Sequence, residues 1–131
     1  GGELSAHYYF RDFWRADTGM LAALHVLAAL GGQPEPLSKL VAAFDRYIGS
    51  GEINSKVADQ AERIRAVRSA YAQRPGVEVD ELDGLTVSAA DWWFNLRPSN
   101  TEPLLRLNVE AADTATLVAA RDEVLALIRA T

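Results

Sequence analysis

The sequence predicts an α+β fold for residues 47–131, in which an antiparallel sheet of four strands carries two helices on one face. Three observations lead to this prediction. Two segments repeat apolar residues at helical spacings of three and four. Between them lie short β-prone segments, and Asp83-Gly84 is a typical hairpin turn. Consecutive strands joined by short turns pair in antiparallel fashion, and the helices then cover one face.

The chain opens with a loop and a helix. Residues 1–16 are rich in glycine and then in aromatic residues, which predicts a loop that packs onto another surface. Asp17 is a suitable N-cap for a helix that runs to about Leu30 and ends at Gly31-Gly32. This helix is apolar almost all round, so we expect it to be buried between layers.

A change in amino-acid composition near residue 47 indicates a domain boundary. A second helix is predicted over 36–46, because Pro36 suits its first turn. The segment Ile48–Gly51 has the composition of a short linker. We therefore divide the chain into residues 1–46, the tail end of another domain, and residues 47–131, an α+β domain.

The second domain has the predicted order strand, helix, four strands, helix, although its first strand is marginal. Trp92 and Trp93 are adjacent, so they should face opposite sides of their strand. Asp113 is the expected N-cap of the last helix. The predicted ranges are 52–54, 56–73, 77–82, 85–89, 92–96, 104–109 and 114–130.

Composition excludes several classes of function. The chain has 131 residues, is 49% apolar and 24% charged, carries a net charge of −5 and has no cysteine. The negative charge argues against general binding of nucleic acid or anionic membranes. Without cysteine there are no disulfides, thiolate metal sites or thiol nucleophiles, which favours a cytoplasmic location. The longest apolar run, Met20–Leu30, is shorter than the roughly 20 residues that span a bilayer.

The segment Arg97-Pro-Ser-Asn-Thr-Glu-Pro is a candidate phosphate cradle. Arginine presents a fork of donors that matches phosphate oxygens, and hydroxyls and turn N–H groups can add to it. The alternative is a plain polar turn with a solvated Arg97. Glu102 would oppose a phosphate, so we expect it to face away, toward Arg106.

The N-terminal segment Gly2–His7 could recognise sugar hydroxyls, because buried hydrogen bonds from carboxylate and hydroxyl groups are costly to lose. The alternative is a frayed N-terminus.

Together these two motifs resemble a known enzyme family. Gly2-Glu-Leu-Ser-Ala-His-Tyr-Tyr-Phe-Arg-Asp is similar to the sugar-binding loop of the α-D-phosphohexomutases, and the Arg97–Pro103 segment resembles the phosphate-binding loop of their C-terminal domain. The two motifs occur in the family's order, about ninety residues apart. Further segments, including Leu105–Glu110, resemble the bacterial phosphomannomutase/phosphoglucomutase branch.

The resemblance implies an isomerase that moves phosphate between C1 and C6 of a hexose through a phosphoserine and a hexose 1,6-bisphosphate, assisted by Mg²⁺. Its C-terminal domain would have a TATA-binding-protein-like α+β fold, and residues 1–46 would be the mostly helical remnant of an α/β third domain. Position 100 would adopt a left-handed conformation. By analogy, sugar hydroxyls would be bound by Glu3 and Ser5, and the phosphate that is not transferred by Arg97, Ser99, Asn100 and Thr101.

The sequence departs from the family pattern in one substitution and in two missing motifs. Leu4 replaces a common methionine of similar volume. No stretch resembles the family's phosphoserine loop or its Asp-x-Asp-x-Asp metal loop, so we expect this chain to be catalytically inactive and to bind no Mg²⁺ itself. Because it starts at Gly1 rather than Met, we expect a piece of a longer protein.

The expected partners are mannose or glucose 1- and 6-phosphates, the 1,6-bisphosphate and the N-terminal domains of the same protein, with no nucleic acid and no membrane. A non-catalytic phosphosugar-binding module and a protein-interaction module remain the alternative functions.

Overall fold

The computed structural model describes residues 1–3 and 5–130, so Leu4 lies outside the described residues. The chain divides into two compact units, Gly1–Asp45 and Arg46–Thr131.

In the first unit, helix α1 (Gly19–Gly31) is capped by Thr18 and not by the predicted Asp17. The Thr18 hydroxyl accepts a hydrogen bond from the Leu21 N–H at 3.2 Å. Asp17 is unavailable because its carboxylate contacts His7 and the backbone N–H of Tyr8 instead. The expected cap was therefore wrong by one residue.

The apolar surface of α1 is not buried, in contrast to the prediction. The helix has no buried residue, and Met20, Leu24 and Leu27 are all more than half exposed. Among its described residues this unit has no sheet that could cover the helix. Helix α2 (Leu37–Ala42) follows Pro36 and is shorter than the predicted 36–46.

The described part of the second unit forms a six-stranded antiparallel sheet, in which β1 and β2 both pair with β6. The sheet class agrees with the sequence, but four strands were predicted. Residues 48–49, expected in a linker, pair with β6, and the marginal strand near 53 pairs with the same edge. The strands are β1 (Ile48–Gly49), β2 (Ile53–Lys56), β3 (Glu78–Asp80), β4 (Leu85–Ser88), β5 (Trp92–Pro98) and β6 (Leu104–Ala111).

A bulge separates β1 from β2. Gly49 pairs with Glu110 and Ile53 with Leu107, so three residues, 50–52, oppose only two residues of β6. Gly51 has a φ of +66°, a conformation that glycine adopts without steric cost. The bulge therefore bends the edge of the sheet at residues 50–52.

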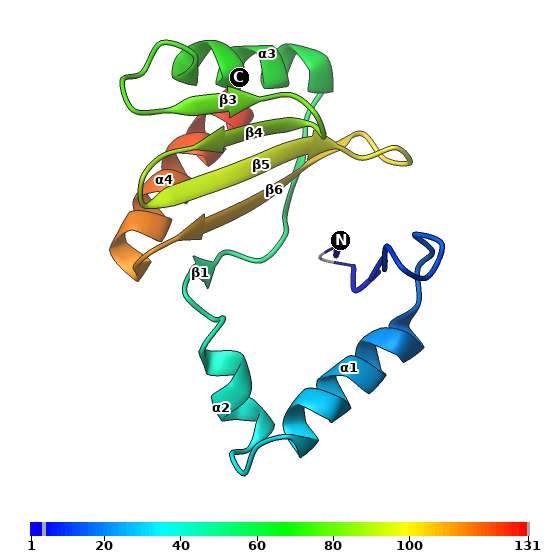
Figure 1. Ribbon diagram of the computed structural model, residues 1–131. Helices are drawn as coiled ribbons and strands as arrows, with labels where there is room; N and C mark the ends of the chain where they lie inside the picture. The colour runs from blue at the N-terminus through cyan, green and yellow to red at the C-terminus, as the bar shows by residue number, and fades with distance from the viewer. Residues whose placement is uncertain (4, 131) are drawn as a thin grey trace. The chain divides into compact units, whose positions relative to one another are not determined.

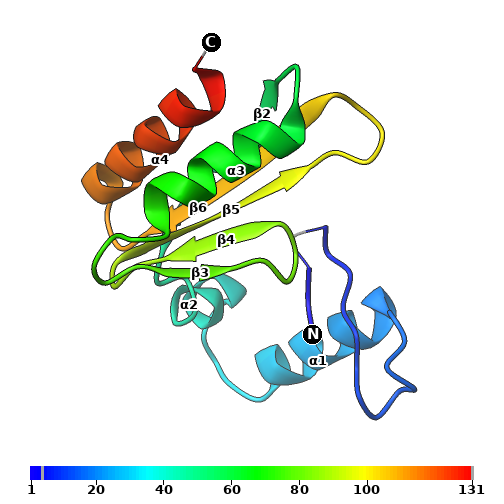
Figure 2. The ribbon, with the colours of Figure 1, turned by 90° about the horizontal axis from the view of Figure 1, so that it is seen from above.

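Both helices of this unit pack on one face of the sheet (Figures 1 and 2). Helix α4 (Thr114–Arg129) is capped by Asp113, as expected, whereas helix α3 (Gln60–Tyr71) is capped by Asp59, a residue predicted to lie inside the helix. Helix α3 starts later than the predicted residue 56, because Lys56 is the last residue of β2.

The core lies between these helices and the sheet. Alternate strand residues, among them Phe94 and Leu96, are fully buried against Val67 and Tyr71 of α3 and against α4. Trp92 packs on this core, and its neighbour on the opposite face, Trp93, donates a hydrogen bond to Glu110, as the alternation predicts. The helix-free face carries Trp93 beside polar side chains such as Asn95 and Thr86, which are hydrogen-bonded to each other.

None of the helices in the described residues is both long and apolar enough to cross a lipid bilayer.

Candidate functional site

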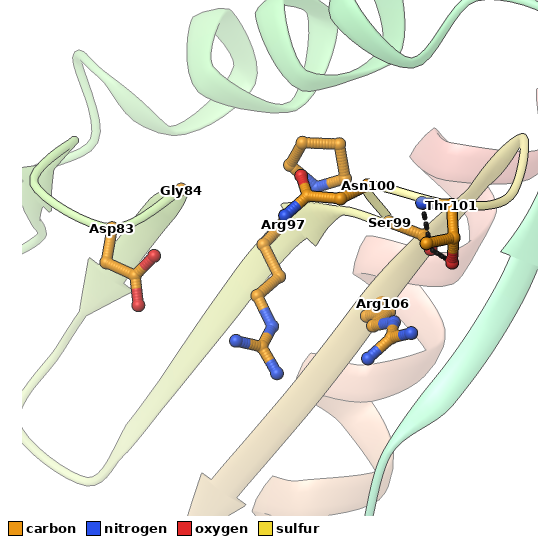
Figure 3. Close-up of a pocket in the computed structure, with 8 residues that line it drawn as sticks. Asp83, Gly84, Arg97, Ser99, Asn100, Thr101 and Arg106 are labelled. Atoms are coloured by element: carbon orange, nitrogen blue, oxygen red, sulfur yellow. Dashed lines mark hydrogen bonds between the residues drawn. The ribbon is translucent and has the colours of Figure 1, made fainter. Parts of the chain in front are cut away.

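A pocket of about 370 Å³ lies where β5 and β6 meet the loop that joins them (Figure 3). It brings together the four residues predicted to bind phosphate and four others. Its lining comprises Asp83, Gly84, Arg97, Pro98, Ser99, Asn100, Thr101 and Arg106.

The loop after β5 is held closed by its own hydrogen bonds. The backbone N–H of Ser99 donates to the carbonyl of Leu104 at 2.9 Å. The buried Ser99 hydroxyl accepts from the N–H groups of Thr101 and Glu102 at 3.4 and 3.3 Å. From α3, the amide of Gln60 donates to the carbonyls of Glu102 and Leu104 at 3.1 and 2.8 Å. The loop is therefore preorganised at both ends.

Asn100 does not have the left-handed conformation predicted for it. Among the described residues, positive φ values at non-glycine positions occur at Ala6, Trp14 and Arg15. The hydrogen bonds from the Thr101 and Glu102 N–H groups to the Ser99 hydroxyl close the turn. Asn100 therefore does not need a positive φ. The side chains of Asn100 and Thr101 are exposed at the pocket.

Two arginines face each other across the strands beside this loop. Arg97 on β5 and Arg106 on β6 are direct cross-strand partners, and their guanidinium groups extend to the same side of the sheet (Figure 3). Like charges in this position repel each other, so the pair favours an anion between or beside them. Arg106 lies near Glu52, with 3.9 Å between its Nη1 and the Glu52 Oε2. The expected pairing of Arg106 with Glu102 was wrong.

Arg106 was not among the residues predicted for the site. The predicted strands, 92–96 and 104–109, left Arg97 in the loop and fixed no register. The pairing of Arg97 with Arg106 follows only from the register of the folded sheet.

The turn before β4 supplies the opposite wall of the pocket through Asp83 and Gly84. Gly84 has a φ of +71°, and a Cβ there would lie 2.7 Å from the carbonyl oxygen of Leu96 and 2.9 Å from the Cβ of Arg97. Only glycine permits this close approach of the turn to the strand that carries Arg97.

We predict that Gly84→Ala destabilises the second unit by about 2–4 kcal/mol, the sum of a strained positive φ and a steric clash with backbone. Urea unfolding followed by tryptophan fluorescence measures this change. Gly76→Ala is the control: its φ is also positive, but no atom lies within 4 Å of its Cβ position. Equal losses in the two variants would contradict the steric argument.

In the first unit, Glu3 and Ser5 lie together at the surface, as the sugar-loop hypothesis requires. The Glu3 carboxylate accepts hydrogen bonds from the Tyr9 hydroxyl at 2.8 Å and from the Ser5 hydroxyl at 3.0 Å. These two hydrogen bonds, first that from Tyr9 and then that from Ser5, lower the pKa of Glu3 below its ordinary value. The loop thus presents an ionised carboxylate beside two hydroxyls.

His7 braces this loop. Its Nδ1 lies 2.5 Å from the Asp17 carboxylate, which also accepts the backbone N–H of Tyr8 at 2.9 Å. The hydrogen bond to Asp17 raises the pKa of His7, and the same bond lowers the pKa of Asp17. The contact is therefore strongest in the acidic window between the two pKa values, where both groups are charged.

Among residues 1–3 and 5–130, no three acidic or histidine side chains gather in a group that could hold a metal ion.

Comparisons with known proteins match both units of the chain to one family. Residues 52–127 match the family model of the phosphoglucomutase/phosphomannomutase C-terminal domain, and residues 1–47 match that of the same family's alpha/beta/alpha domain III. A phosphomannomutase of Escherichia coli is 46% identical over 98% of this chain, and one of Methanocaldococcus jannaschii is 40% identical over 97%. The chain spans 28% of the length of each of these relatives.

A solved structure shows the same fold. A phosphoglucomutase/phosphomannomutase family protein from Burkholderia thailandensis matches 98% of this chain with a TM-score of 0.78 and 28% sequence identity, and the match covers 28% of that protein.

The fold and the family models together place this chain among the phosphosugar mutases. It belongs to the phosphoglucomutase/phosphomannomutase family. Within the family it corresponds to part of domain III followed by the C-terminal domain, and the relatives from Escherichia coli and Methanocaldococcus jannaschii are named phosphomannomutases.

Proposed function

We propose that this chain is the substrate-binding portion of a phosphomannomutase/phosphoglucomutase. The enzyme would interconvert hexose 6-phosphate and hexose 1-phosphate through a phosphoserine and a hexose 1,6-bisphosphate, in the cytoplasm. The single observation that carries the proposal is the pair of opposed arginines beside a preorganised loop in one pocket.

The pocket suits a phosphate that stays bound while the other end of the sugar reacts. A phosphate dianion accepts hydrogen bonds from guanidinium and hydroxyl groups, and residues that carry both kinds of donor, Arg97, Arg106 and Thr101, line this pocket. The free energy of binding at the unreactive end can orient the reactive end for phosphoryl transfer. In this proposal Arg97, Ser99, Asn100 and Thr101 hold that phosphate.

The N-terminal loop would contribute recognition of the sugar. Glu3 can accept hydrogen bonds from sugar hydroxyls, and Ser5 can both donate and accept. We assign these two residues to the sugar hydroxyls, residues 1–46 to the end of domain III and residues 47–131 to the phosphate-binding domain. The phosphoserine and the ligands of Mg²⁺ would come from other parts of the enzyme.

A segment exchange tests the proposal. The matching segment of the Escherichia coli phosphomannomutase is replaced by this chain, and conversion of mannose 6-phosphate to mannose 1-phosphate is measured. We expect the hybrid enzyme to be active, its Arg97→Ala variant to lose most of its activity, and this chain alone to show none. A folded hybrid that releases no product would favour the alternative, a non-catalytic phosphosugar-binding module.

A further inference from the structure

Glu52 is an acidic residue whose side chain lies near both Arg97 and Arg106. Its Oε2 lies 3.9 Å from the Nη2 of Arg97 and 3.9 Å from the Nη1 of Arg106. Its other oxygen, Oε1, is 3.5 Å from the amide nitrogen of Asn54. One carboxylate oxygen is therefore shared between the two guanidinium groups that flank the pocket.

The backbone directs this carboxylate to the arginines. Ile53 packs on the core, so its neighbours Glu52 and Asn54 face the helix-free side of the sheet. Asn54 is the cross-strand partner of Arg106, and Glu52 is the last residue of the bulge at residues 50–52. A bulge re-aims the side chains next to it and is common beside functional sites. The position of Glu52 is thus built into the sheet.

The contacts of the Glu52 carboxylate with the two arginines are weak enough for a bound anion to replace them. Distances of 3.9 Å are longer than direct charge-assisted hydrogen bonds of about 2.8 Å. The side chains of Glu52, Arg97 and Arg106 are 32%, 41% and 34% exposed, so water and solutes reach all three. The buried Nε of Arg106 has no hydrogen-bond partner among the described residues. Arg106 therefore keeps unused donor capacity.

We propose that Glu52 is an internal counter-ion of the phosphate site, which competes with the bound phosphate for Arg97 and Arg106. This inference rests on the proposed function, because it assumes that the pocket takes phosphate. Without a ligand, the carboxylate reduces the repulsion between the two guanidinium groups. When a phosphate dianion binds, the negative charge of Glu52 repels it and weakens its binding.

Such weakening has a use in the proposed reaction. A bisphosphorylated intermediate must present first one phosphate and then the other to this pocket, so each must leave again quickly. Two arginines carry a charge of +2, and Glu52 reduces the charge of the cluster to +1. Affinity differences within one site arise mostly in the dissociation rate, so this reduction speeds release.

The test is the affinity of this chain for inorganic phosphate, measured by NMR titration of the wild type and of Glu52→Gln. Removing one negative charge near a dianion at a solvated site should tighten binding about fivefold. Glu78→Gln is the matched control, since it removes the same charge from β3 and should change the affinity less than about twofold. Backbone spectra unchanged beyond residues 50–54 and their partners show that the variants keep the fold.

The outcomes separate this inference from the proposed function. Tighter binding by Glu52→Gln alone supports the counter-ion. Weaker binding would show that Glu52 positions the arginines for phosphate, and unchanged binding would show that it does not act on the site; either result overturns the inference while the phosphate site stands. If the wild type does not bind phosphate at residues 97–101, the proposed phosphate site fails, and the inference fails with it.

Discussion

Replacing Arg97 with alanine is expected to weaken the binding of inorganic phosphate to this chain by about 30-fold, which corresponds to the loss of roughly 2 kcal/mol from charge-assisted hydrogen bonds. Arg97 stands at the end of β5, lines the pocket and is opposed by a second arginine. The remaining Arg106 does not replace it, because its side chain starts from the neighbouring strand β6. NMR titration of wild type and variant with phosphate measures the change.

Two further variants make this result interpretable. Arg97→Lys keeps the charge but loses the planar fork, so it should recover only part of the affinity. Arg65→Ala removes the same charge from the exposed surface of α3, outside the pocket, and should bind like the wild type. Equal weakening by Arg97→Ala and Arg65→Ala would mean that phosphate responds only to net charge, and the pocket would lose its assignment.

Replacing Phe94 with alanine should destabilise the second unit by about 4 kcal/mol, because it removes a large side chain from a packed core and leaves a cavity. Phe94 is fully buried. Its ring meets Tyr71 edge-to-face, with centroids 5.2 Å apart, and stacks on Trp92 at 6.1 Å. Aromatic pairs of this kind add to the effect of burial alone.

Urea unfolding of the chain, followed by far-ultraviolet circular dichroism, measures the loss of stability. Leu82→Ala is the control, because Leu82 is 92% exposed and its truncation should change the free energy of unfolding by less than about 0.5 kcal/mol. A loss below 1 kcal/mol for Phe94→Ala would contradict the packing described for the sheet and its helices.

Much of the second unit could be predicted from the sequence. The helices α3 and α4 follow apolar residues at helical spacing, and the cap at Asp113 is a local hydrogen bond to a nearby N–H group. The strands β4, β5 and β6 follow from alternation and short turns. These signals lie within a few residues of the structure that they specify.

What could not be predicted depends on contacts between distant segments. The pairing of Ile48 with β6 overrides the linker composition of residues 48–51, because strand pairing is decided by the partner and not by local preference. Asp17 resembles a helix cap, but His7 and Tyr8 engage it ten and nine residues away. The exposure of α1 likewise depends on which elements surround it.

The candidate site likewise has a part that could be predicted from local sequence and a part that depends on distant contacts. Its loop could be found as a motif, and Arg97, Ser99, Asn100 and Thr101 do line one pocket. The roles of Arg106 and Glu52 required the register of the sheet and the bulge in its edge. The left-handed conformation expected at Asn100 was wrong, because a hydroxyl at Ser99 organises the turn in another way.

The most direct test of the phosphate site is an NMR titration of this chain with mannose 6-phosphate, beside inorganic phosphate and unphosphorylated mannose. We expect saturable shifts at residues 97–101 and at Arg106 with both phosphate compounds, and none with mannose. Additional shifts at Glu3 and Ser5 with mannose 6-phosphate alone would extend the site to the sugar loop. Residues 97–101 that stay unshifted at millimolar concentrations of both phosphate compounds, or that shift equally with mannose, would contradict the assignment of the pocket.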